Sequence, residues 1–422
     1  MPIQNNVLNR IYSLSKMGIK LGLDNMEQAL KALDLNISKI RFIHVAGTNG
    51  KGSTCAMLQK LILKGNKDSR VGLYTSPHLI KFNERIKIND SMISDEEIIQ
   101  YANFIFEKCE HLPLTFFEFT TLMSFIHFIK NKVDFAVIET GMGGRMDATN
   151  IISPEICIIT SVGMDHMEYL GKEINTIAME KAGILKKNTF AIISDTEAKD
   201  TLLKEALKKD VKEVLLMNRD FYFSVNEDKT FNLHMEKPFK FNYYDLKKSL
   251  RGDHQYKNTS CAIVACRLLG INISEKDINT ALETTSWMGR LQKFVINGNI
   301  IYLDVSHNVE GISATIKFLL EYHKNEVIHI ACGFMKDKDY GTMISSLYQV
   351  SEKLFLIPTK VEERQIQKKD YESVIKSDWK NVFICNDYKD AFERIMKEKG
   401  TIIFTGSIFN FEEIYKLIEE RQ

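Results

Sequence analysis

A lysine and a serine stand among three glycines in one short stretch of this chain, at residues 47–53. The stretch follows an apolar run at 41–46 and precedes a helix-compatible run at 54–61. Glycines leave backbone N–H groups free to face an anion, and the order strand, loop, helix places those groups at a helix N-terminus. We therefore expect this loop to bind phosphate. Its residues are Gly47, Thr48, Asn49, Gly50, Lys51, Gly52 and Ser53.

The spacing departs from the common phosphate-loop pattern, because Gly52 separates Lys51 from the hydroxyl of Ser53. The alternative is a glycine-rich turn that binds nothing. That alternative gives no reason for ordering a lysine inside the loop. The strand and helix on either side favour phosphate binding.

Three further polar groups stand at the ends of predicted strands. Ser76 follows a strand at 70–74, Glu139 ends a strand at 133–139, and His166 follows a strand at 156–160. Ligands of open α/β sheets collect at the carboxyl ends of the strands. A buried carboxylate at such an end, beside a phosphate loop, is typical of a Mg²⁺ ligand. Without a metal, burying the unpaired charge of Glu139 would cost free energy. Ser76 could instead only form the turn, and a lone histidine is more often a packing or surface residue.

Together these motifs resemble the phosphate loop and metal-binding strands of the Mur-ligase superfamily. The segments Thr-Ser-Pro-His-Leu at 75–79 and Phe-Asn-Glu-Arg-Ile at 82–86 are similar to those of one branch, the folylpolyglutamate synthase and dihydrofolate synthase family. The resemblance runs through nearly the whole chain. It implies an ATP-dependent ligase that adds L-glutamate to folates or dihydropteroate through an acyl phosphate.

The resemblance also implies roles for single residues. It places the catalytic groups at Lys51, His166, Lys181, Asp304 and His307. It adds Asn258, Arg290, Asp304 and His307 to the loop at 47–53 as the ATP site. It implies two Mg²⁺ sites built from Ser53, Ser76, Glu139, His166 and a carbamylated Lys181. It assigns the folate or pterin site to Arg85, Phe117, Asp147 and Ala148, and the glutamate site to Lys338 and Ser407.

Several of these residues have simpler explanations from the sequence. Lys181 near a helix end favours the helix dipole, and Phe117 beside an acidic residue reads as core at a helix start. Asp147 could form an Asx turn without a ligand, and Lys338 could belong to a solvated charge run.

At 304–308 the chain keeps the acid, histidine and asparagine of the family motif Asp-Gly-Ala-His-Asn, and it has valine and serine in place of the glycine and alanine.

A chain of 422 residues is too long for one ordinary core. Strands alternating with helices predict an α/β fold. We expect a Mur-ligase-like ATPase domain with a P-loop over residues 1–288, carrying a small antiparallel excursion near 221–243. A smaller Rossmann-like glutamate-ligase domain is expected over residues 289–422, with strands from 292–296 to 401–404.

The composition narrows the class of protein. Hydrophobic residues make up 44% and charged residues 26%, as in globular proteins, and 56 basic residues balance 55 acidic ones. No nucleic acid or membrane partner is expected. The seven cysteines, mostly embedded in apolar runs, predict reduced core thiols and no zinc site. With no signal-peptide pattern at the start, we expect a cytoplasmic enzyme that acts as a monomer on small molecules.

Two other classes of protein remain as alternatives. A cell-wall Mur ligase or a cyanophycin-type synthetase shares the phosphate loop and the domain order. The folate branch is favoured by the segments at 75–79 and 83–86, and by the short stretch before the loop, where cell-wall ligases carry a UDP-binding domain. A nucleotide-hydrolysing switch or binding protein without ligase activity would not need the amino acid.

Overall fold

The computed structural model of the chain describes residues 2–18, 20, 22–248, 250–359 and 364–422. It contains two compact units. The first comprises Met1–Ser249 and Gln255–Ser286, and the second comprises Leu250–His254 and Trp287–Gln422. Residues 250–254 thus belong to the second unit, although they precede the boundary at 288 that the sequence suggested.

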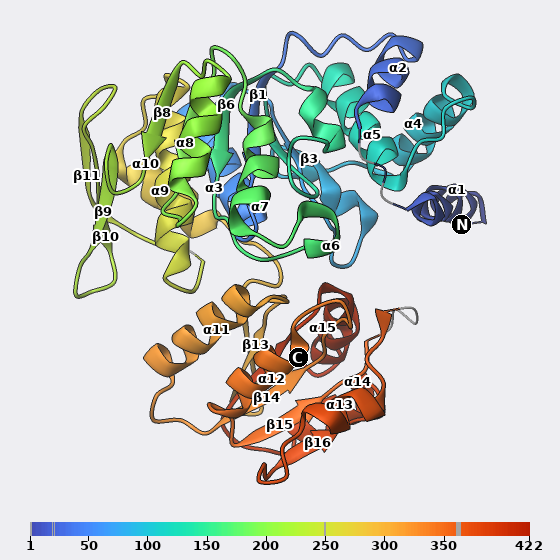
Figure 1. Cartoon of the computed structure of the whole chain (residues 1–422), viewed down its shortest axis with the longest axis vertical. Coiled ribbons are helices and arrows are strands. Elements are labelled where there is room, and N and C mark those ends of the chain that lie inside the picture. Colours follow the sequence, from blue (N-terminus) through green and yellow to red (C-terminus); the bar gives the residue numbers. More distant parts are fainter. Residues whose placement is uncertain (1, 19, 21, 249, 360–363) are drawn as a thin grey trace. The chain divides into compact units, whose positions relative to one another are not determined.

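An eight-stranded sheet forms the centre of the first unit (Figure 1), in the order β4-β3-β2-β5-β1-β6-β7-β8. The six strands from β2 to β8 in that order are parallel, whereas β3 and β4 are antiparallel additions at one edge. The strands are β1 (Arg41–Ala46), β2 (Val71–Tyr74), β3 (Ile86–Ile88), β4 (Ser91–Met92), β5 (Phe135–Glu139), β6 (Pro154–Ile159), β7 (Phe190–Ile193) and β8 (Glu213–Leu216).

Helices alternate with these strands, as expected from the pattern, and two further helices precede β1 and two follow β8 along the chain. They are α1 (Pro2–Ser13), α2 (Asp24–Ala32), α3 (Lys51–Gly65), α4 (Asp95–Lys108), α5 (Phe116–Lys130), α6 (Met167–Leu170), α7 (Ile174–Lys181), α8 (Lys199–Lys208), α9 (His254–Leu268) and α10 (Glu275–Thr284). One core cluster joins α1, α2, α4 and α5 to β1, β2 and β5, and a second joins α7 and α8 to β6 and β7.

The predicted antiparallel excursion is a separate sheet of three strands, β9 (Phe221–Val225), β10 (Phe231–Met235) and β11 (Phe241–Leu246). Its third strand begins at Phe241, two residues later than residue 239, where the sequence pattern predicts its start. This sheet contributes none of the expected site residues.

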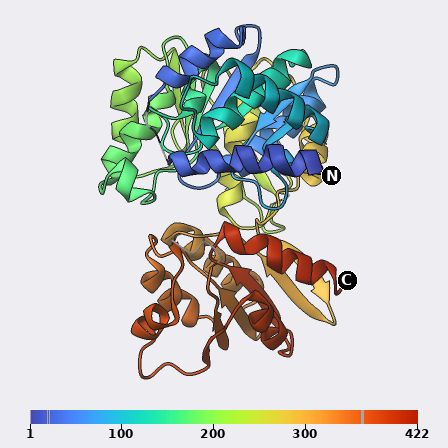
Figure 2. The same ribbon diagram turned by 90° about the vertical axis from the view of Figure 1, so that its right-hand side faces the viewer.

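The second unit has a six-stranded sheet in the order β12-β13-β17-β14-β15-β16, parallel except for β12. The strands are β12 (Gln292–Ile296), β13 (Asn299–Leu303), β14 (Ile328–Cys332), β15 (Lys353–Leu356), β16 (Val382–Ile384) and β17 (Thr401–Thr405). The helices are α11 (Val309–Tyr322), α12 (Tyr340–Tyr348), α13 (Lys368–Val374), α14 (Tyr388–Ile395) and α15 (Phe411–Glu419). Figure 2 shows the β12–β13 hairpin beside α15. The rings of Phe294 on β12 and Tyr415 on α15 meet edge to face.

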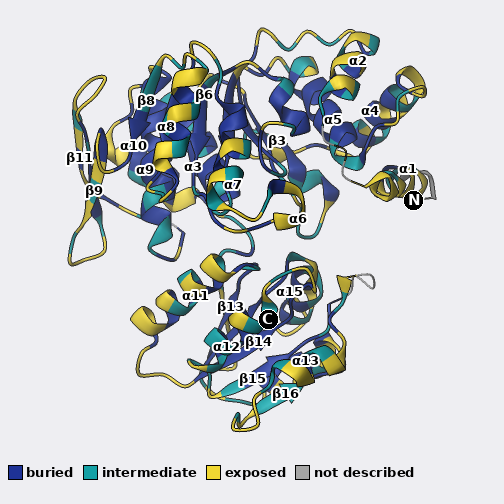
Figure 3. Cartoon of the chain, in the orientation of Figure 1, coloured by how far each residue is buried: buried dark blue, intermediate teal, exposed yellow. Residues whose placement is uncertain are grey.

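Parallel strands covered on both sides need apolar side chains on both faces, and β1 and β5 are buried along nearly their whole length (Figure 3). All seven cysteines lie in described segments, are buried and form no disulfide, which confirms the expected core thiols. Within the described residues, the helices are too short or too polar for any one of them to cross a bilayer. The predicted α/β fold with two sheets and an antiparallel addition is confirmed.

Candidate active site

The loop between β1 and α3 has the form of a phosphate cradle. Gly50 precedes the first residue of α3 and has a φ of 86°, a conformation that favours glycine. A Cβ on Gly50 would lie 2.5 Å from Oδ1 of Asn258, so this asparagine of α9 packs directly against the loop. The first turn of α3 presents its unbonded N–H groups at this point. The structure therefore brings Asn258, an expected ATP ligand, to the phosphate loop.

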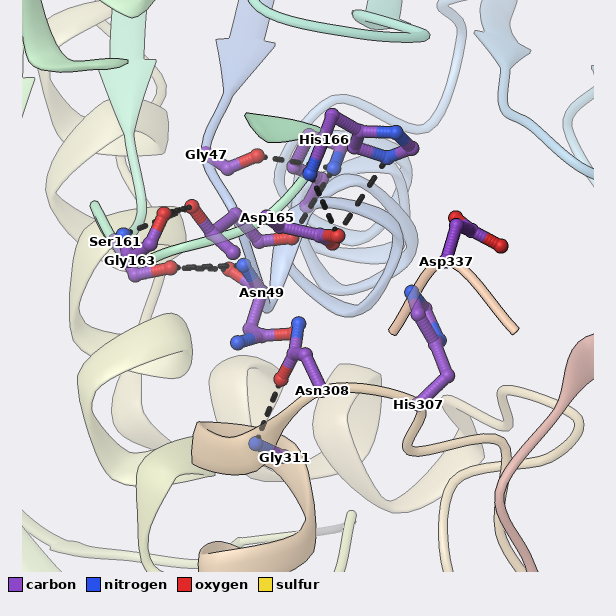
Figure 4. Close-up of polar contacts among 12 residues, drawn as sticks. Gly47, Asn49, Ser161, Gly163, Asp165, His166, His307, Asn308, Gly311 and Asp337 are labelled. Atoms are coloured by element: carbon purple, nitrogen blue, oxygen red, sulfur yellow. Dashed lines mark hydrogen bonds and ion pairs between the residues drawn. The ribbon is translucent and has the colours of Figure 1, made fainter. Parts of the chain in front are cut away.

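The loop that follows β6 braces this cradle from the side (Figure 4). The backbone N–H groups of Thr48 and Asn49 donate to the carbonyl and the hydroxyl of Ser161, at 3.0 and 2.8 Å. The Thr48 hydroxyl lies 3.0 Å from the carbonyl oxygen of Gly163, and the Thr160 hydroxyl donates to the carbonyl of Asn49 at 2.7 Å. These bonds fix the backbone of the phosphate loop before any ligand arrives.

Lys51 and Ser53 occupy the first turn of α3. The Lys51 ammonium donates to the carbonyl oxygens of Gly47 and Thr48 at 3.0 and 3.3 Å, so it lies folded back over the loop. Ser53 is buried, and the amide of Gln255 reaches its hydroxyl at 3.5 Å. A lysine over the loop and a hydroxyl at its base are the groups that a nucleotide phosphate and its metal require.

Glu139 and Ser76 meet at the ends of two neighbouring strands, β5 and β2. The backbone N–H of Ser76 donates to Oε2 of Glu139 at 3.1 Å, and Glu139 is only 4% exposed. The next N–H, that of Thr140, bonds the carbonyl of Val45 and so aligns this edge with the end of β1. The expected convergence of strand ends therefore brings Glu139 to Ser76 and sets it beside the strand that leads into the phosphate loop.

His166 and Lys181 both follow β6 along the chain. His166 opens α6 with a φ of 50°, its backbone N–H donates to Oδ1 of Asp165 at 2.9 Å, and its ring lies 3.8 Å from Oδ2 of Asp165. Lys181 is the last residue of α7 and is buried. Asp165 is itself buried, and sequence reasoning passed over it because only its histidine neighbour stood out.

The side chains of Glu139 and Ser53 are suited to a magnesium ion that also binds substrate phosphates, not to a metal held by protein ligands alone. Among the described residues, no group of three or more histidine, cysteine, aspartate and glutamate side chains is close enough to hold a metal. Magnesium usually takes one or two carboxylates and completes its shell with substrate phosphates and water. Glu139 and the hydroxyl of Ser53, beside a phosphate loop, match that requirement.

A cavity of about 340 Å³ in the first unit opens beside the start of α5, and most of its lining is apolar. Its size and character suit a flat aromatic ligand. Phe117, Asp147 and Ala148, three of the four expected pterin residues, line it. The other lining residues are Ser15, Gly18, Lys20, Gly22, Thr115, Phe116, Glu118, Gly141, Met142 and Met146.

Phe117 is held in the cavity wall by the cap of α5. The Thr115 N–H donates to the Glu118 carboxylate at 2.7 Å, and the Glu118 N–H donates to the Thr115 hydroxyl at 3.3 Å. This reciprocal cap fixes the first turn of the helix, which carries Phe117. A Cβ on Gly141 would lie 2.7 Å from the Phe117 ring, so only glycine at 141 allows the ring to pack where it does.

Asp147 lies buried between the cavity and a short 3-10 helix, η3 (Ala148–Ile151). Its Oδ2 accepts from the N–H of Met142 at 2.9 Å, and its Oδ1 accepts from the N–H and the hydroxyl of Thr149 at 3.0 and 2.5 Å. Burial raises the pKa of Asp147 although these bonds oppose the shift. The Asx-type turn that was the alternative explanation is therefore present, and the same carboxylate lines the cavity.

Arg85, the fourth expected pterin residue, is not among the residues that line this cavity. It is buried behind the wall, where its Nε–H donates to Nδ1 of His78 at 2.7 Å and its guanidinium lies 5.1 Å from the ring centre of Phe116. Burial lowers the pKa of Arg85, and burial together with the charge of Arg85 lowers the pKa of His78 to about 3. His78 is thus a neutral acceptor for this buried cation.

In the second unit, the expected residues Asp304 and Ser407 lie together near the end of β13. Asp304 accepts hydrogen bonds from the N–H groups of Leu291 and Ser306, both at 3.2 Å, and from the Thr315 hydroxyl at 2.9 Å. It lines a small cavity together with Ser407, whose hydroxyl caps the turn after β17. The carboxylate thereby shapes the loop at 304–308, a role that the sequence did not indicate.

In the rest of that loop, the side chains of His307 and Asn308 bond to nearby backbone groups. Nδ1 of His307 lies 2.9 Å from the carbonyl of Val305, and Asn308 caps α11 through a 2.8 Å bond from the N–H of Gly311 (Figure 4). Val305 is buried, so the valine in place of the usual glycine packs without opening the turn. Arg290 and Lys338 are both half-buried, on the segments before β12 and after β14.

Comparisons with known proteins agree with these two units. The Mur ligase middle domain model matches residues 45–266, and the Mur ligase, glutamate ligase domain model matches residues 289–408. The Bacillus subtilis (strain 168) dihydrofolate synthase/folylpolyglutamate synthase is 33% identical over 430 residues, which cover 97% of each chain.

Solved structures share the fold. Escherichia coli FolC in complex with DHPP and ADP has a TM-score of 0.90 at 24% identity and covers 98% of both chains. The bifunctional folylpolyglutamate synthase/dihydrofolate synthase of Yersinia pestis, complexed with AMPPNP and Mn ion, has a TM-score of 0.88 at 24% identity, covering 99% of this chain and 98% of that one. The chain belongs to the dihydrofolate synthase/folylpolyglutamate synthase family of Mur ligases.

Proposed function

We propose that this protein is an ATP-dependent ligase that joins L-glutamate to dihydropteroate and to reduced folates through an acyl phosphate. The observation that carries the proposal is the pairing, within one unit, of a braced phosphate loop with an apolar cavity that ends in a buried carboxylate. The 33% identity to the B. subtilis enzyme over 97% of both chains supports the same activity.

The reaction has two steps. In the first, an oxygen of the acceptor carboxylate attacks the γ-phosphorus of ATP, and ADP leaves. In the second, the α-amine of glutamate attacks the acyl carbon, phosphate leaves, and the amine loses a proton to a base or to water. Both steps bring negatively charged groups together, so positioning and neutralisation of charge dominate the catalysis.

The residues of the first unit would divide that work. The N–H groups at the start of α3 and the ammonium of Lys51 would hold the phosphates. Two Mg²⁺ ions, when bound at Ser53 and Glu139 and near Ser76, His166 and a carbamylated Lys181, would neutralise the phosphate oxygens. Lys51 would leave its bonds to the loop carbonyls of Gly47 and Thr48 as it pairs with phosphate.

The cavity beside α5 would take the pteridine ring. Phe117 offers an aromatic wall, and the Asp147 carboxylate would accept hydrogen bonds from the amino and ring N–H groups of the pteridine. In the second unit, Arg290, Asp304 and His307 would bind the nucleotide, and Lys338 and Ser407 would bind the incoming glutamate.

Phosphate release from ATP tests this proposal. We expect rapid release only when glutamate and a pteroate acceptor are both present. Lys51→Ala should remove it, whereas Lys64→Ala in the last turn of the same helix should retain it. If phosphate is released from ATP at the same rate without glutamate as with it, the protein is a hydrolytic switch and the proposed ligase activity is refuted.

A further inference from the structure

We infer that His44 is a positioning residue for pterin recognition, which acts through the Thr149 hydroxyl on the Asp147 carboxylate. This inference rests on the proposed function and adds to it a buried group outside the cavity. His44 is on β1, whereas Thr149 and Asp147 are more than a hundred residues further along the chain.

His44 stands in an unusual place for a histidine. It is at the centre of a parallel strand flanked by β5 and β6 and has 0% of its surface exposed. Such positions normally hold Val, Ile or Leu. Burial, with the charge of Lys186 adding to it, lowers the pKa of His44 to about 3. The imidazole is therefore neutral at physiological pH, and burying its ring nitrogens costs stability where they are not hydrogen-bonded.

The direction of the hydrogen bonds follows from the chemistry of the three groups. Nε2 of His44 lies 2.8 Å from Oγ1 of Thr149, and that hydroxyl donates to Oδ1 of Asp147 at 2.5 Å. The two backbone N–H donors to Asp147 favour its ionised form, and an ionised carboxylate only accepts, so in that form the Thr149 proton belongs to the bond to Asp147 and the hydroxyl accepts from His44. Nε2 therefore carries the ring proton. Nδ1 is then an acceptor, and it has no partner among the described residues.

The two hydrogen bonds that join His44 to Thr149 and Thr149 to Asp147, here called the relay, fix the orientation of the Thr149 hydroxyl. A threonine hydroxyl can rotate about its Cβ–Oγ bond and can turn to a nearby backbone carbonyl instead. With His44 donating to its oxygen, the Thr149 hydroxyl points its proton at Asp147. The N–H groups of Met142 and Thr149 hold the same carboxylate from the backbone. Asp147 thereby presents one fixed orientation to the cavity that it lines.

His44 does not touch the cavity itself, since it is fully buried and absent from the residues that line it. It is therefore not a catalytic residue. A purely structural role, as a core histidine that anchors η3, is the competing explanation. That role would reduce stability when His44 is lost, but it would not act selectively on the pterin substrate or depend on Asp147.

The test compares two replacements of His44 in the full-length enzyme, with steady-state kinetics for dihydropteroate, ATP and glutamate. His44→Leu keeps the bulk and removes the donor, and we expect it to raise KM for dihydropteroate about tenfold while KM for ATP changes less than about twofold. His44→Gln places an amide N–H near the position of Nε2 and should restore KM to within about threefold of the wild type.

Two further variants and a control separate positioning from stability. Thr149→Val should reproduce the effect of His44→Leu, and Thr149→Ser should not. In an Asp147→Asn background, His44→Leu should add less than about twofold, because the target of the relay is gone. The matched control is His329→Leu, which removes a buried histidine with an unpartnered Nδ1 from β14 of the second unit and should leave KM for dihydropteroate unchanged.

Equal changes in the KM of dihydropteroate and of ATP, or an undiminished effect of His44→Leu without Asp147, would overturn the inference. If His44→Leu does not fold, the pair Thr149→Val and Thr149→Ser decides by the same criteria. A wild-type enzyme that fails to use dihydropteroate or folates would instead refute the proposed function.

Discussion

The backbone N–H of Ser76 donates a hydrogen bond to Oε2 of Glu139 at 3.1 Å. The two residues are 63 positions apart in the chain: Ser76 follows β2, and Glu139 is the last residue of the adjacent parallel strand β5. The bond orients a carboxylate that is almost fully buried at the edge where the phosphate loop also begins. We propose that the charge of Glu139 helps to hold the nucleotide-bound metal.

Glu139→Gln tests that dependence, because the amide keeps an acceptor for the Ser76 N–H and removes only the charge. We expect kcat to fall on the order of a hundredfold to a thousandfold, with a higher Mg²⁺ concentration needed for half-maximal activity. Activity titrated against Mg²⁺ measures both quantities, and a thermal melt checks that the fold is intact. A variant with wild-type activity at wild-type Mg²⁺ would remove Glu139 from the metal site.

Lys181 is a buried lysine at the end of α7, and its proposed carbamate would be a carboxylate-like ligand. Lys181→Ala should lose nearly all activity, bicarbonate should not restore it, and a short carboxylic acid should restore part of it by taking the place of the carbamate. Mass spectrometry of the intact wild-type protein at neutral pH should detect the added carboxyl group. If neither the rescue nor the added mass is found, Lys181 acts as an ordinary lysine.

Gly141→Ala should narrow the cavity by pushing on the ring of Phe117, from which the new Cβ would be 2.7 Å away. We expect KM for the pterin substrate to rise several-fold while KM for ATP is unchanged, since the three atoms nearest to the new Cβ all belong to Phe117. The matched control is Gly341→Ala on α12, where the new Cβ would meet its nearest neighbour only at 3.9 Å. An unchanged pterin KM in Gly141→Ala would separate Phe117 from substrate binding.

The low pKa of His44 predicts a pH dependence of stability. Its pKa is about 3 in the folded protein and near 6.5 in the unfolded chain, so only the unfolded chain binds the proton between those values. Stability from this group is present above pH 6.5 and is lost as the pH falls, by about 2 kcal/mol between pH 7 and pH 5. The neighbouring charges are Lys186 and, through Thr149, Asp147.

Urea unfolding at both pH values, followed in the wild type and in His44→Leu, measures this contribution. The variant should lose distinctly less stability between pH 7 and pH 5 than the wild type. The same pH dependence in both proteins would show that His44 titrates normally in the folded state.

The sequence allowed much of the fold to be predicted, because the relevant signals are local. The apolar runs at β1, β5 and β6 and the glycines before α3 indicated a parallel sheet with a phosphate loop. The rule that ligands gather at the carboxyl ends of such strands predicted that Ser76, Glu139 and His166 lie at one edge of the sheet. The structure brings Ser76 and Glu139 into contact, whereas His166 contacts Asp165.

The missed features depend on side chains that meet across long stretches of chain. His44 appeared only as one polar residue in a strand, because nothing local to it indicates Thr149, 105 residues later. The three bonds of Asp304 to residues 291, 306 and 315 depend equally on the folded loop. A buried polar residue within an otherwise apolar parallel strand was the available signal for His44, and it would have marked the residue for attention.

The most direct test of the central claim is transfer of radiolabelled L-glutamate, with ATP and Mg²⁺, to dihydropteroate, tetrahydrofolate and a UDP-muramoyl acceptor in parallel. The proposed activity predicts labelled product with dihydropteroate and tetrahydrofolate, with one ADP formed per glutamate added. It predicts no labelled product with the UDP-muramoyl acceptor. Label appearing only on the UDP-muramoyl acceptor, or on none of the three, would contradict it.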